Sequence, residues 1–339
     1  MTDPSARPSG RCWVFSEAKA GTAAQSRGVA ERLGFETETR LVYRPGGGKT
    51  GLALRLASGW AHLRNVHLNR IRPPWPDVAI SSGGRAEPAM MAIARRSGGA
   101  VFTVHLQYPA PGFDRFDLCF VSRHDWRPEF DARDDLLPMV GAPHRVDAAR
   151  VASHRGAAEQ RFGDLPGPRA AVMIGGPNRA YAFSSGRIDS LVAQLQALQA
   201  AGWSLLVTTS RRSDPTLLPR LRQALHGDRG FVWDRVSENP YFQYLAIADA
   251  VLVTADSITM TCEAASTGKP VYSIPLEDKP SPFVEKFNRF HRDMQETLGV
   301  TRPFTGTIEP YGYTPLDEAG RVAGIVRDRL AARRQQGAA

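Results

Sequence analysis

The chain has 339 residues, of which 42% are hydrophobic and 23% are charged. This length suggests about two domains, each with its own core, and the hydrophobic fraction excludes a disordered chain. The longest run without a charge, residues 191–210, contains three glutamines, so we exclude a membrane-spanning helix. The net charge is +9, and 38 of the 43 basic residues are arginine. Arginine suits phosphate, nucleic acid or an anionic surface, but codon bias produces the same excess.

Short apolar runs alternate with helical stretches, a pattern typical of parallel sheets covered by helices on both faces. In the first half we expect strands near 12–16, 38–43, 78–81, 101–106, 118–121 and 137–140. Expected helices lie near 23–33, 51–63, 86–97 and 148–161.

The segment GDLPGP at 163–168 is the best domain boundary, because its prolines and glycines cannot continue a helix. The pattern then restarts, with strands near 170–174, 204–208, 230–233, 250–254 and 271–274. Helices are expected near 185–201, 215–226, 240–246 and 258–267, and a last helix with a basic end near 315–336. The sequence therefore predicts two consecutive Rossmann-like halves.

Several kinds of site are disfavoured. Cys12, Cys119 and Cys262 are scattered and form no CxxC, which argues against a disulfide framework and a zinc site and favours reducing cytoplasm. No metal or other cofactor is expected. Aromatic residues are not interleaved with a basic stripe, so nucleic acid is not an expected partner. The GGGKT at 46–50 is interpreted as a flexible loop, because the glycine that a P-loop needs five residues earlier is Tyr43.

In the first half, two loops follow strands and precede helices. Gly21 lies in such a turn, whose free amides can hold an anion or a sugar hydroxyl, although for an isolated glycine a plain tight turn is the favoured explanation. The loop at 81–88 carries Ser82, Arg85 and Glu87 with two glycines, which is more than a turn requires. Because open α/β sheets bind ligands at the carboxyl ends of their strands, we expect this loop to face a ligand.

The second half has three polar strand ends, the richest of which is TADSITMTCEAASTGKPV at 254–271. Asp256 or Ser257 caps a helix whose amides and dipole favour a phosphate, and Glu263 lies nearly two turns on, where a carboxylate can reach a ribose diol. Capping, a solvated helix face and a terminating glycine would explain each feature singly. The three polar strand ends in one half of the chain together favour a phosphate-bearing ligand. The predicted binding residues of this half are Gly175, Gly176, Asn178, Ser210, Arg211, Asp256, Ser257, Met260 and Glu263.

Three segments carry a family resemblance: PPWPDVAISSGGRAEP (73–88), LLVTTSRRSDP (205–215) and NPYFQYLAIADAVLVTADSITMTCEAASTGKPVY (239–272). They resemble the bacterial and plant family of the mitochondrial fission "elongated mitochondria" protein, over residues 12–330. That family in turn is similar to the GT-B glycosyltransferases. The resemblance implies an α/β, GT-B-like fold, in which two Rossmann-like domains with parallel sheets face a central cleft. It implies an acceptor-side domain at 1–150, a nucleotide-sugar-side domain at 165–315, and a C-terminal helix and tail at 316–339.

This resemblance implies that the helix after Asp256 contacts the diphosphate and that Glu263 contacts the ribose. It also implies that helix amides and basic side chains, and not a metal ion, neutralise the diphosphate. In this family a histidine commonly follows the glycine of the first loop. The corresponding residue here is Thr22, and threonine cannot act as a base near neutral pH. The base is then Glu17, Glu87, His105 or Asp125, or the protein is not catalytic.

We therefore expect a metal-independent glycosyltransferase that uses a nucleotide-diphosphate sugar. Its acceptor would be an unknown glycan or lipid, for example a cell-envelope precursor at the inner-membrane surface. This reading places the protein in the cytoplasm or peripherally on that membrane. The alternatives are a non-catalytic adaptor, as the plant members suggest, and a nucleotide-sugar epimerase of the same architecture.

Overall fold

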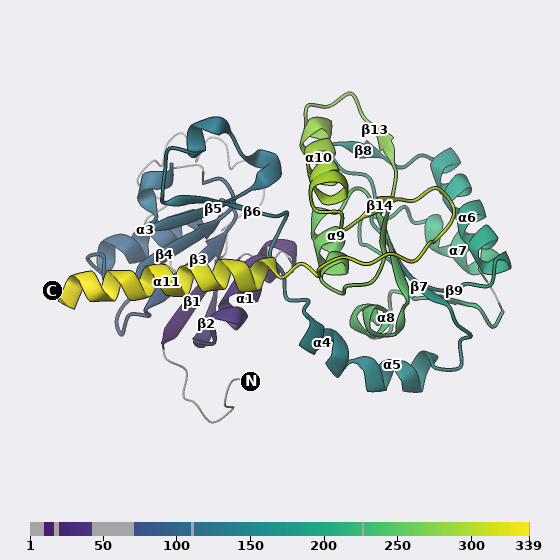
Figure 1. The fold of residues 1–339 in the computed structure, drawn as a ribbon, viewed down its shortest axis with the longest axis horizontal. Coiled ribbons are helices and arrows are strands. Elements are labelled where there is room, and N and C mark those ends of the chain that lie inside the picture. Colours follow the sequence, from purple (N-terminus) through teal and green to yellow (C-terminus); the bar gives the residue numbers. More distant parts are fainter. Residues whose placement is uncertain (1–9, 17–19, 43–70, 110–111, 226, 339) are drawn as a thin grey trace. The chain divides into compact units, whose positions relative to one another are not determined.

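The computed structural model describes residues 10–16, 20–42, 71–109, 112–225 and 227–338. The expected helix at 51–63, the GGGKT loop and the candidate base Glu17 lie outside these residues. The chain divides into two compact units, one formed by Met1–Arg145 with Glu318–Ala339 and the other by Val146–Asp317 (Figure 1). No helix in the described ranges is both long and apolar enough to span a membrane.

The first unit contains a six-stranded sheet in the order β2-β1-β3-β4-β5-β6, with every neighbouring pair parallel. Its strands are β1 (Arg11–Ser16), β2 (Glu36–Leu41), β3 (Val78–Ser82), β4 (Phe102–Leu106), β5 (Leu118–Ser122) and β6 (Leu136–Met139). Its helices are α1 (Ala20–Leu33), α3 (Glu87–Arg96) and α11 (Glu318–Ala338), with 3-10 turns at Phe113–Arg115, Arg123–Asp125 and Pro128–Phe130. The strand order reverses between β1 and β3.

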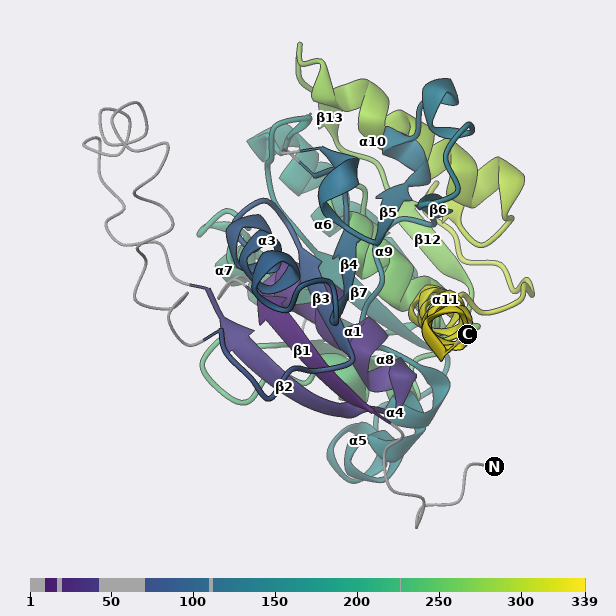
Figure 2. The ribbon, with the colours of Figure 1, turned by 90° about the vertical axis from the view of Figure 1, so that its left-hand side faces the viewer.

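Helices lie on both faces of this sheet (Figure 2), and the side chains on both faces of β1 are buried. Successive strand side chains point to opposite faces. Cys12 and Val14 therefore pack in the cluster that contains α1 and α11, whereas Trp13 and Phe15 pack in the cluster that contains α3. Covering on both sides explains why β1 is a continuous apolar run rather than an alternating one.

The second unit contains another six-stranded parallel sheet, in the order β10-β9-β7-β11-β12-β14. Its strands are β7 (Arg169–Ile174), β9 (Ser204–Thr209), β10 (Gly230–Val232), β11 (Ala250–Thr254), β12 (Val271–Ile274) and β14 (Arg302–Pro303). Its helices are α4 (Ala148–Ser153), α5 (Arg155–Phe162), α6 (Ser185–Ala200), α7 (Leu217–Ala224), α8 (Tyr241–Ile247), α9 (Ile258–Ala265) and α10 (Phe283–Arg292), which continues into a π-helix at Asp293–Thr297. The order is that of a Rossmann sheet and reverses between β7 and β11.

The structure departs from the predicted elements in several places. The division falls between Arg145 and Val146, ahead of GDLPGP, because α4 and α5 pack against α8 of the second unit. The helix expected at 148–161 is two helices, α4 and α5. The strand expected at 38–43 begins two residues earlier, as β2. Short elements were missed: α10, β14, and the antiparallel pair of β8 (Tyr181–Ala182) and β13 (Glu277–Asp278).

The C-terminal helix α11 is part of the core of the first unit. Val322, Val326 and Leu330 lie on one face and are buried in the same cluster as Val14 of β1. At the start of α11, a carboxylate oxygen of Glu318 accepts the backbone N–H of Val140 at 2.9 Å. The chain thus returns from the second unit to complete the first.

We expect Leu330→Ala to lower the free energy of unfolding by about 2–5 kcal/mol, the usual cost of truncating a buried leucine. Gln335→Ala, on the exposed part of the same helix, should change it by less than about 0.5 kcal/mol. Urea unfolding of the full chain measures both. Equal stabilities of the two variants would show that α11 does not contribute to this core.

Candidate functional site

Polar residues gather where the strand order of the second sheet reverses. Gly175 follows β7, Ser210 follows β9, and Asp256 follows β11 shortly after the strand ends. The carboxyl ends of parallel strands share one edge, and ligands of open α/β sheets bind outside that edge at the reversal. The three strand ends that the sequence singled out therefore lie together.

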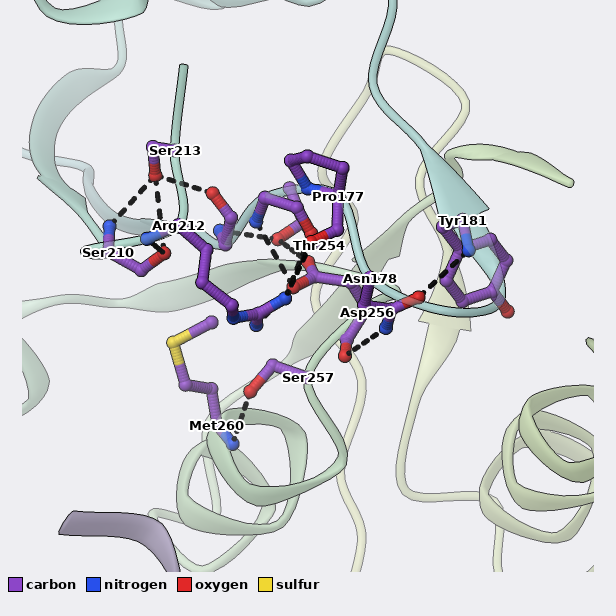
Figure 3. A network of polar contacts seen from close by, with 12 residues as sticks. Pro177, Asn178, Tyr181, Ser210, Arg212, Ser213, Thr254, Asp256, Ser257 and Met260 are labelled. Atoms are coloured by element: carbon purple, nitrogen blue, oxygen red, sulfur yellow. Dashed lines mark hydrogen bonds and ion pairs between the residues drawn. The ribbon is translucent and has the colours of Figure 1, made fainter. Parts of the chain in front are cut away.

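The centre of this edge is the carboxylate of Asp256, whose side chain is completely buried (Figure 3). It accepts hydrogen bonds from Thr254 Oγ1 at 2.6 Å, from the backbone N–H of Gly176 at 3.1 Å and from Arg212 Nη2 at 2.5 Å. A Cβ atom at Gly175 would lie 2.2 Å from both carboxylate oxygens. Glycine is required there because the backbone passes directly against this charge.

Arg212 is held from both sides. Its Nη1 donates to the carbonyl of Gly176 at 3.0 Å, while its Nη2 forms the ion pair with Asp256. The loop that carries it is fixed by Ser213, whose buried hydroxyl donates to the carbonyl of Gly175 at 2.5 Å and accepts the N–H of Ser210 at 2.9 Å. The side chain of Arg212 nevertheless remains 45% exposed. It is a cation of fixed position at the sheet edge, and among the described residues its Nε–H and the second N–H of Nη2 have no hydrogen-bond partner.

Asn178 braces the loop after β7. Its Oδ1 accepts the backbone N–H groups of Ala180 and Tyr181 at 2.7 and 2.8 Å, and its Nδ2 donates to the carbonyl of Asp256 at 3.1 Å. Lys279 donates from Nζ to the carbonyl of Asn178 at 2.7 Å, which places a second cation beside the loop. The side chain of Asn178 is thus engaged within the protein.

Ser257, rather than Asp256, caps α9. Its hydroxyl accepts the N–H of Met260 at 3.3 Å, and the first backbone bond of the helix runs from Thr261 N to Ser257 O. The N–H groups of Ile258 and Thr259 precede the intrahelical ladder and have no acceptor within the helix. They carry the positive end of the helix dipole to the edge where Arg212 lies.

Glu263 lies on α9, and its carboxylate accepts a hydrogen bond from the hydroxyl of Tyr241, at the start of α8. Burial raises the pKa of Glu263 from 4.5 to about 7, and the bond from Tyr241 lowers this pKa in part. Burial also raises the pKa of Tyr241 well above 10, so its hydroxyl remains a donor. Near neutral pH, Glu263 is poised between its two charge states.

The other predicted residues of this half are less engaged. The side chain of Arg211 is exposed, and Arg212 makes the contacts to Asp256. Met260 is half-buried and packs against the cluster that contains Tyr244 and Val253. Four residues that the sequence analysis did not select build the site. They are Tyr241, Arg212, Ser213 and Thr254.

In the first unit, Glu87 and His105 lie close together, with 3.8 Å between a Glu87 carboxylate oxygen and His105 Nε2. Ser81 Oγ lies 2.8 Å from His105 Nδ1, and all three side chains are buried. Burial lowers the pKa of His105 to about 4, so the imidazole is neutral near pH 7. The separation between Glu87 and His105 is longer than a hydrogen bond, and His105 Nε2 has no hydrogen-bond partner among the described residues, so the three residues form a buried polar cluster at the carboxyl ends of β3 and β4.

The remaining candidates of this unit are spread over other loops. Gly21 lies in the first turn of α1 rather than in the loop before it, and Arg85 is exposed. Ser82 donates to Gln25 Oε1 at 2.8 Å. Asp125 ends the 3-10 turn after β5, where a carboxylate oxygen lies 3.7 Å from His124 Nε2. Within the described residues, no group of three His, Cys, Asp or Glu side chains could hold a metal ion.

Comparison with known sequences assigns a family. The model described as "Mitochondrial fission ELM1" matches residues 20–330. The mitochondrial fission protein ELM1 of Arabidopsis thaliana is 29% identical over 311 residues, which cover 85% of this chain and 71% of that protein. An uncharacterized protein of Rickettsia prowazekii is 23% identical, covering 94% and 98% of the two chains.

Solved structures share the fold at low sequence identity. The UDP-GlcNAc 2-epimerase of Methanocaldococcus jannaschii has a TM-score of 0.57 at 10% identity, covering 94% of this chain and 99% of that one. The MnaA–UDP structure of S. aureus has a TM-score of 0.52 at 11% identity, covering 94% and 89%. The glycotransferase of kitacinnamycin has a TM-score of 0.50 at 16% identity, covering 97% and 95%. The predicted GT-B-like α/β fold is confirmed.

The raised pKa of Glu263 predicts how the free energy of unfolding depends on pH. A carboxyl group whose pKa is higher in the folded state binds more protons there, so its contribution to stability is lost as pH rises from 4.5 through about 7. Glu263→Gln cannot lose a proton, so its Tm relative to the parent should rise between pH 5 and about pH 7 and level off toward pH 8.

Thermal unfolding across this pH range measures the effect, and Glu238→Gln, at an exposed position, is the matched control. The Tm difference between that control and the parent should not vary with pH. A constant difference for Glu263→Gln as well would mean that the Glu263 carboxyl is not perturbed.

Proposed function

The chain belongs to the mitochondrial fission ELM1 family, and we propose that it binds a nucleotide-diphosphate sugar in its second unit and transfers the sugar to an acceptor. The observation that carries this proposal is the edge where Arg212, fixed by the buried Asp256, lies with the free first-turn amides of α9. These groups are donors only. They suit the oxygens of a diphosphate leaving group.

The electrostatics favour a diphosphate that is held mainly by hydrogen bonds. Asp256 offsets much of the charge of Arg212, so the edge has little excess positive charge from this pair. Its donors are nevertheless fixed before a ligand arrives, which reduces the cost of ordering them. The amides of Ile258 and Thr259, the free N–H groups of Arg212 and the ammonium of Lys279 are the binding groups in this proposal.

Glu263 is the proposed contact to the ribose. A carboxylate accepts from both hydroxyls of a diol, whereas an amide of the same shape accepts with one oxygen only. Tyr241 donates to Glu263 Oε2 and orients the carboxylate, which leaves Oε1 and the second lone pair of Oε2 to accept the two hydroxyls. Because the pKa of Glu263 is about 7, ribose binding through the ionised form should strengthen as pH rises through neutrality.

The structural neighbours indicate which nucleotide to test first. An M. jannaschii UDP-GlcNAc 2-epimerase structure contains UDP-GlcNAc and UDP, and the S. aureus structure contains UDP. UDP is therefore the first probe. The same neighbours favour a second candidate function, epimerisation of a nucleotide sugar without an acceptor. The plant relative favours a third, a non-catalytic adaptor in which the nucleotide site is kept.

Two adjacent arginines provide a matched test of the site. Arg212→Ala should weaken UDP binding at least tenfold, equivalent to about 1.4 kcal/mol, because it removes a fixed donor. Arg211→Ala changes the same residue type at an exposed position and should weaken binding less than threefold. Isothermal titration calorimetry of the parent and both variants measures the difference.

Ser257→Ala and Glu263→Gln extend this test to α9, and each should also weaken UDP binding. Circular dichroism of each variant checks that it folds. If the parent, Arg212→Ala and Ser257→Ala bind UDP with equal affinity, the nucleotide does not bind at this edge. No UDP binding by the parent would contradict the proposed function as stated.

Turnover separates the candidate functions. A transferase should release UDP from UDP-GlcNAc in proportion to added acceptor, whereas an epimerase should change the sugar with no acceptor and no UDP release. An adaptor should bind and do neither. Among the described base candidates, Glu87→Gln should abolish transfer while leaving UDP affinity unchanged if Glu87 accepts the acceptor proton. Asp125→Asn tests the other described carboxylate in the same way, since Glu87 and Asp125 both follow strands of the first sheet.

A further inference from the structure

Helix α8 is held at both ends by one short segment of the chain. Tyr241, the first residue of α8, donates its hydroxyl hydrogen to the carboxylate of Glu263 on α9. At the other end of α8, the ammonium of Lys269 donates to the carbonyls of Leu245 at 2.5 Å and of Ala246 at 3.1 Å. The segment from Glu263 to Lys269 therefore fixes where α8 starts and where it ends.

A helix as short as α8 depends on contacts of this kind. It has seven residues, and a helix of this length is not stable in water by itself. The carbonyls in the last turn of a helix have no acceptor role within it, and those of Leu245 and Ala246 are two of these. Lys269 satisfies both carbonyls and places a positive charge at the negative end of the helix dipole.

The backbone of Lys269 is fixed independently of α8. Its carbonyl accepts the hydroxyl of Tyr313 at 2.8 Å, and its N–H donates to Thr267 Oγ1 at 3.3 Å. Gly268, with φ at +73°, ends the turn that follows α9 directly before it. The side chain of Lys269 thus reaches α8 from a backbone that α8 does not determine.

The position of the Lys269 ammonium carries a cost in hydration. The side chain is half-buried, and burial lowers the pKa of Lys269 from 10.5 to about 8. Arg155 approaches the same carbonyl of Ala246 at 3.5 Å, but its side chain is 63% exposed. The two shorter bonds from Lys269 offset the cost of its burial, and they are the contacts that hold this end of α8.

We propose that Lys269 is a positioning residue for the ribose contact, because it fixes the end of α8 and so holds the Tyr241 hydroxyl against Glu263. The inference rests on the proposed function and adds to it a residue that acts through α8 rather than through the ligand. Burial raises the pKa of Glu263 and the bond from Tyr241 lowers it. Loss of that bond should therefore raise this pKa further, which gives a readout that needs no nucleotide.

Lys269→Met removes the ammonium and keeps an unbranched side chain. We expect it to raise the pKa of Glu263 by at least about 0.5, because the Tyr241 hydroxyl is no longer held in place. Carbon-13 NMR of the glutamate carboxyl groups across pH measures this pKa in the full chain, and the spectrum of Glu263→Gln identifies the resonance. Lys269→Arg keeps the charge and the N–H donors and should keep the parent value. Arg155→Met, which removes the exposed cation at the same helix end, should also leave it unchanged.

A double-mutant cycle separates positioning from a direct effect of the Lys269 charge. Tyr241→Phe removes the bond to Glu263 itself, so adding Lys269→Met to it should raise the pKa of Glu263 no further. An equal rise with and without the Tyr241 hydroxyl would overturn the proposal. An unchanged pKa of Glu263 in Lys269→Met, with a lower Tm, would show that Lys269 only stabilises the fold. If Lys269→Met does not fold, Lys269→Gln, which is neutral and shorter, takes its place with the same expectation.

Ligand binding tests the same proposal at the nucleotide. Lys269→Met should weaken UDP binding at least about fivefold but pyrophosphate binding less than about twofold, because pyrophosphate has no ribose for Glu263 to contact. Isothermal titration calorimetry measures both, and equal weakening of the two ligands would contradict a role through the ribose. If the parent binds no UDP, the proposed function fails, whereas the pKa of Glu263 still decides whether Lys269 holds Tyr241 against it.

Discussion

The buried carboxylate of Asp256 is the constraint on which the ligand edge of the second unit depends. An isolated charge in a protein interior is strongly unfavourable, and it persists only where partners satisfy it. Here the partners come from the ends of β7, β9 and β11, since Gly176, Arg212 and Thr254 each donate to this one carboxylate. Its charge therefore ties three strand ends together before any ligand is bound.

This arrangement explains two sequence features with one cause. The paired glycines after β7 are necessary because a Cβ atom at Gly175 would meet Asp256 and one at Gly176 would meet the carbonyl of Arg212, each at 2.2 Å. Arg212 in turn is held through both of its Nη atoms although its side chain is partly exposed, so its geometry is set without a ligand. The edge is preorganised by an internal anion, and its selectivity then rests on donor placement more than on net charge.

Hydrophobic periodicity was sufficient to predict both parallel sheets and the edges where their polar residues meet. It could not decide between Arg211 and Arg212, because the Ser213 hydroxyl fixes the turn and so decides which side chain faces Asp256. Contacts between segments that are distant in the sequence could not be predicted from periodicity either. Tyr241 and Glu263 belong to different helices, and Gln25 lies within a helix that has no motif around it.

The two sheets thus carry different chemistry at equivalent topological positions. The second edge is built around a buried ion pair, whereas the first has the two linked amides of Gln25 and Gln107 and no ion pair within their hydrogen-bonded cluster. To brace β3 against α1, the bond from Ser82 to Gln25 would suffice, and position 107, with φ at +90°, would be served better by glycine. The bond from Gln107 Nε2 to Gln25 is the contact that a glycine at this strained position could not make.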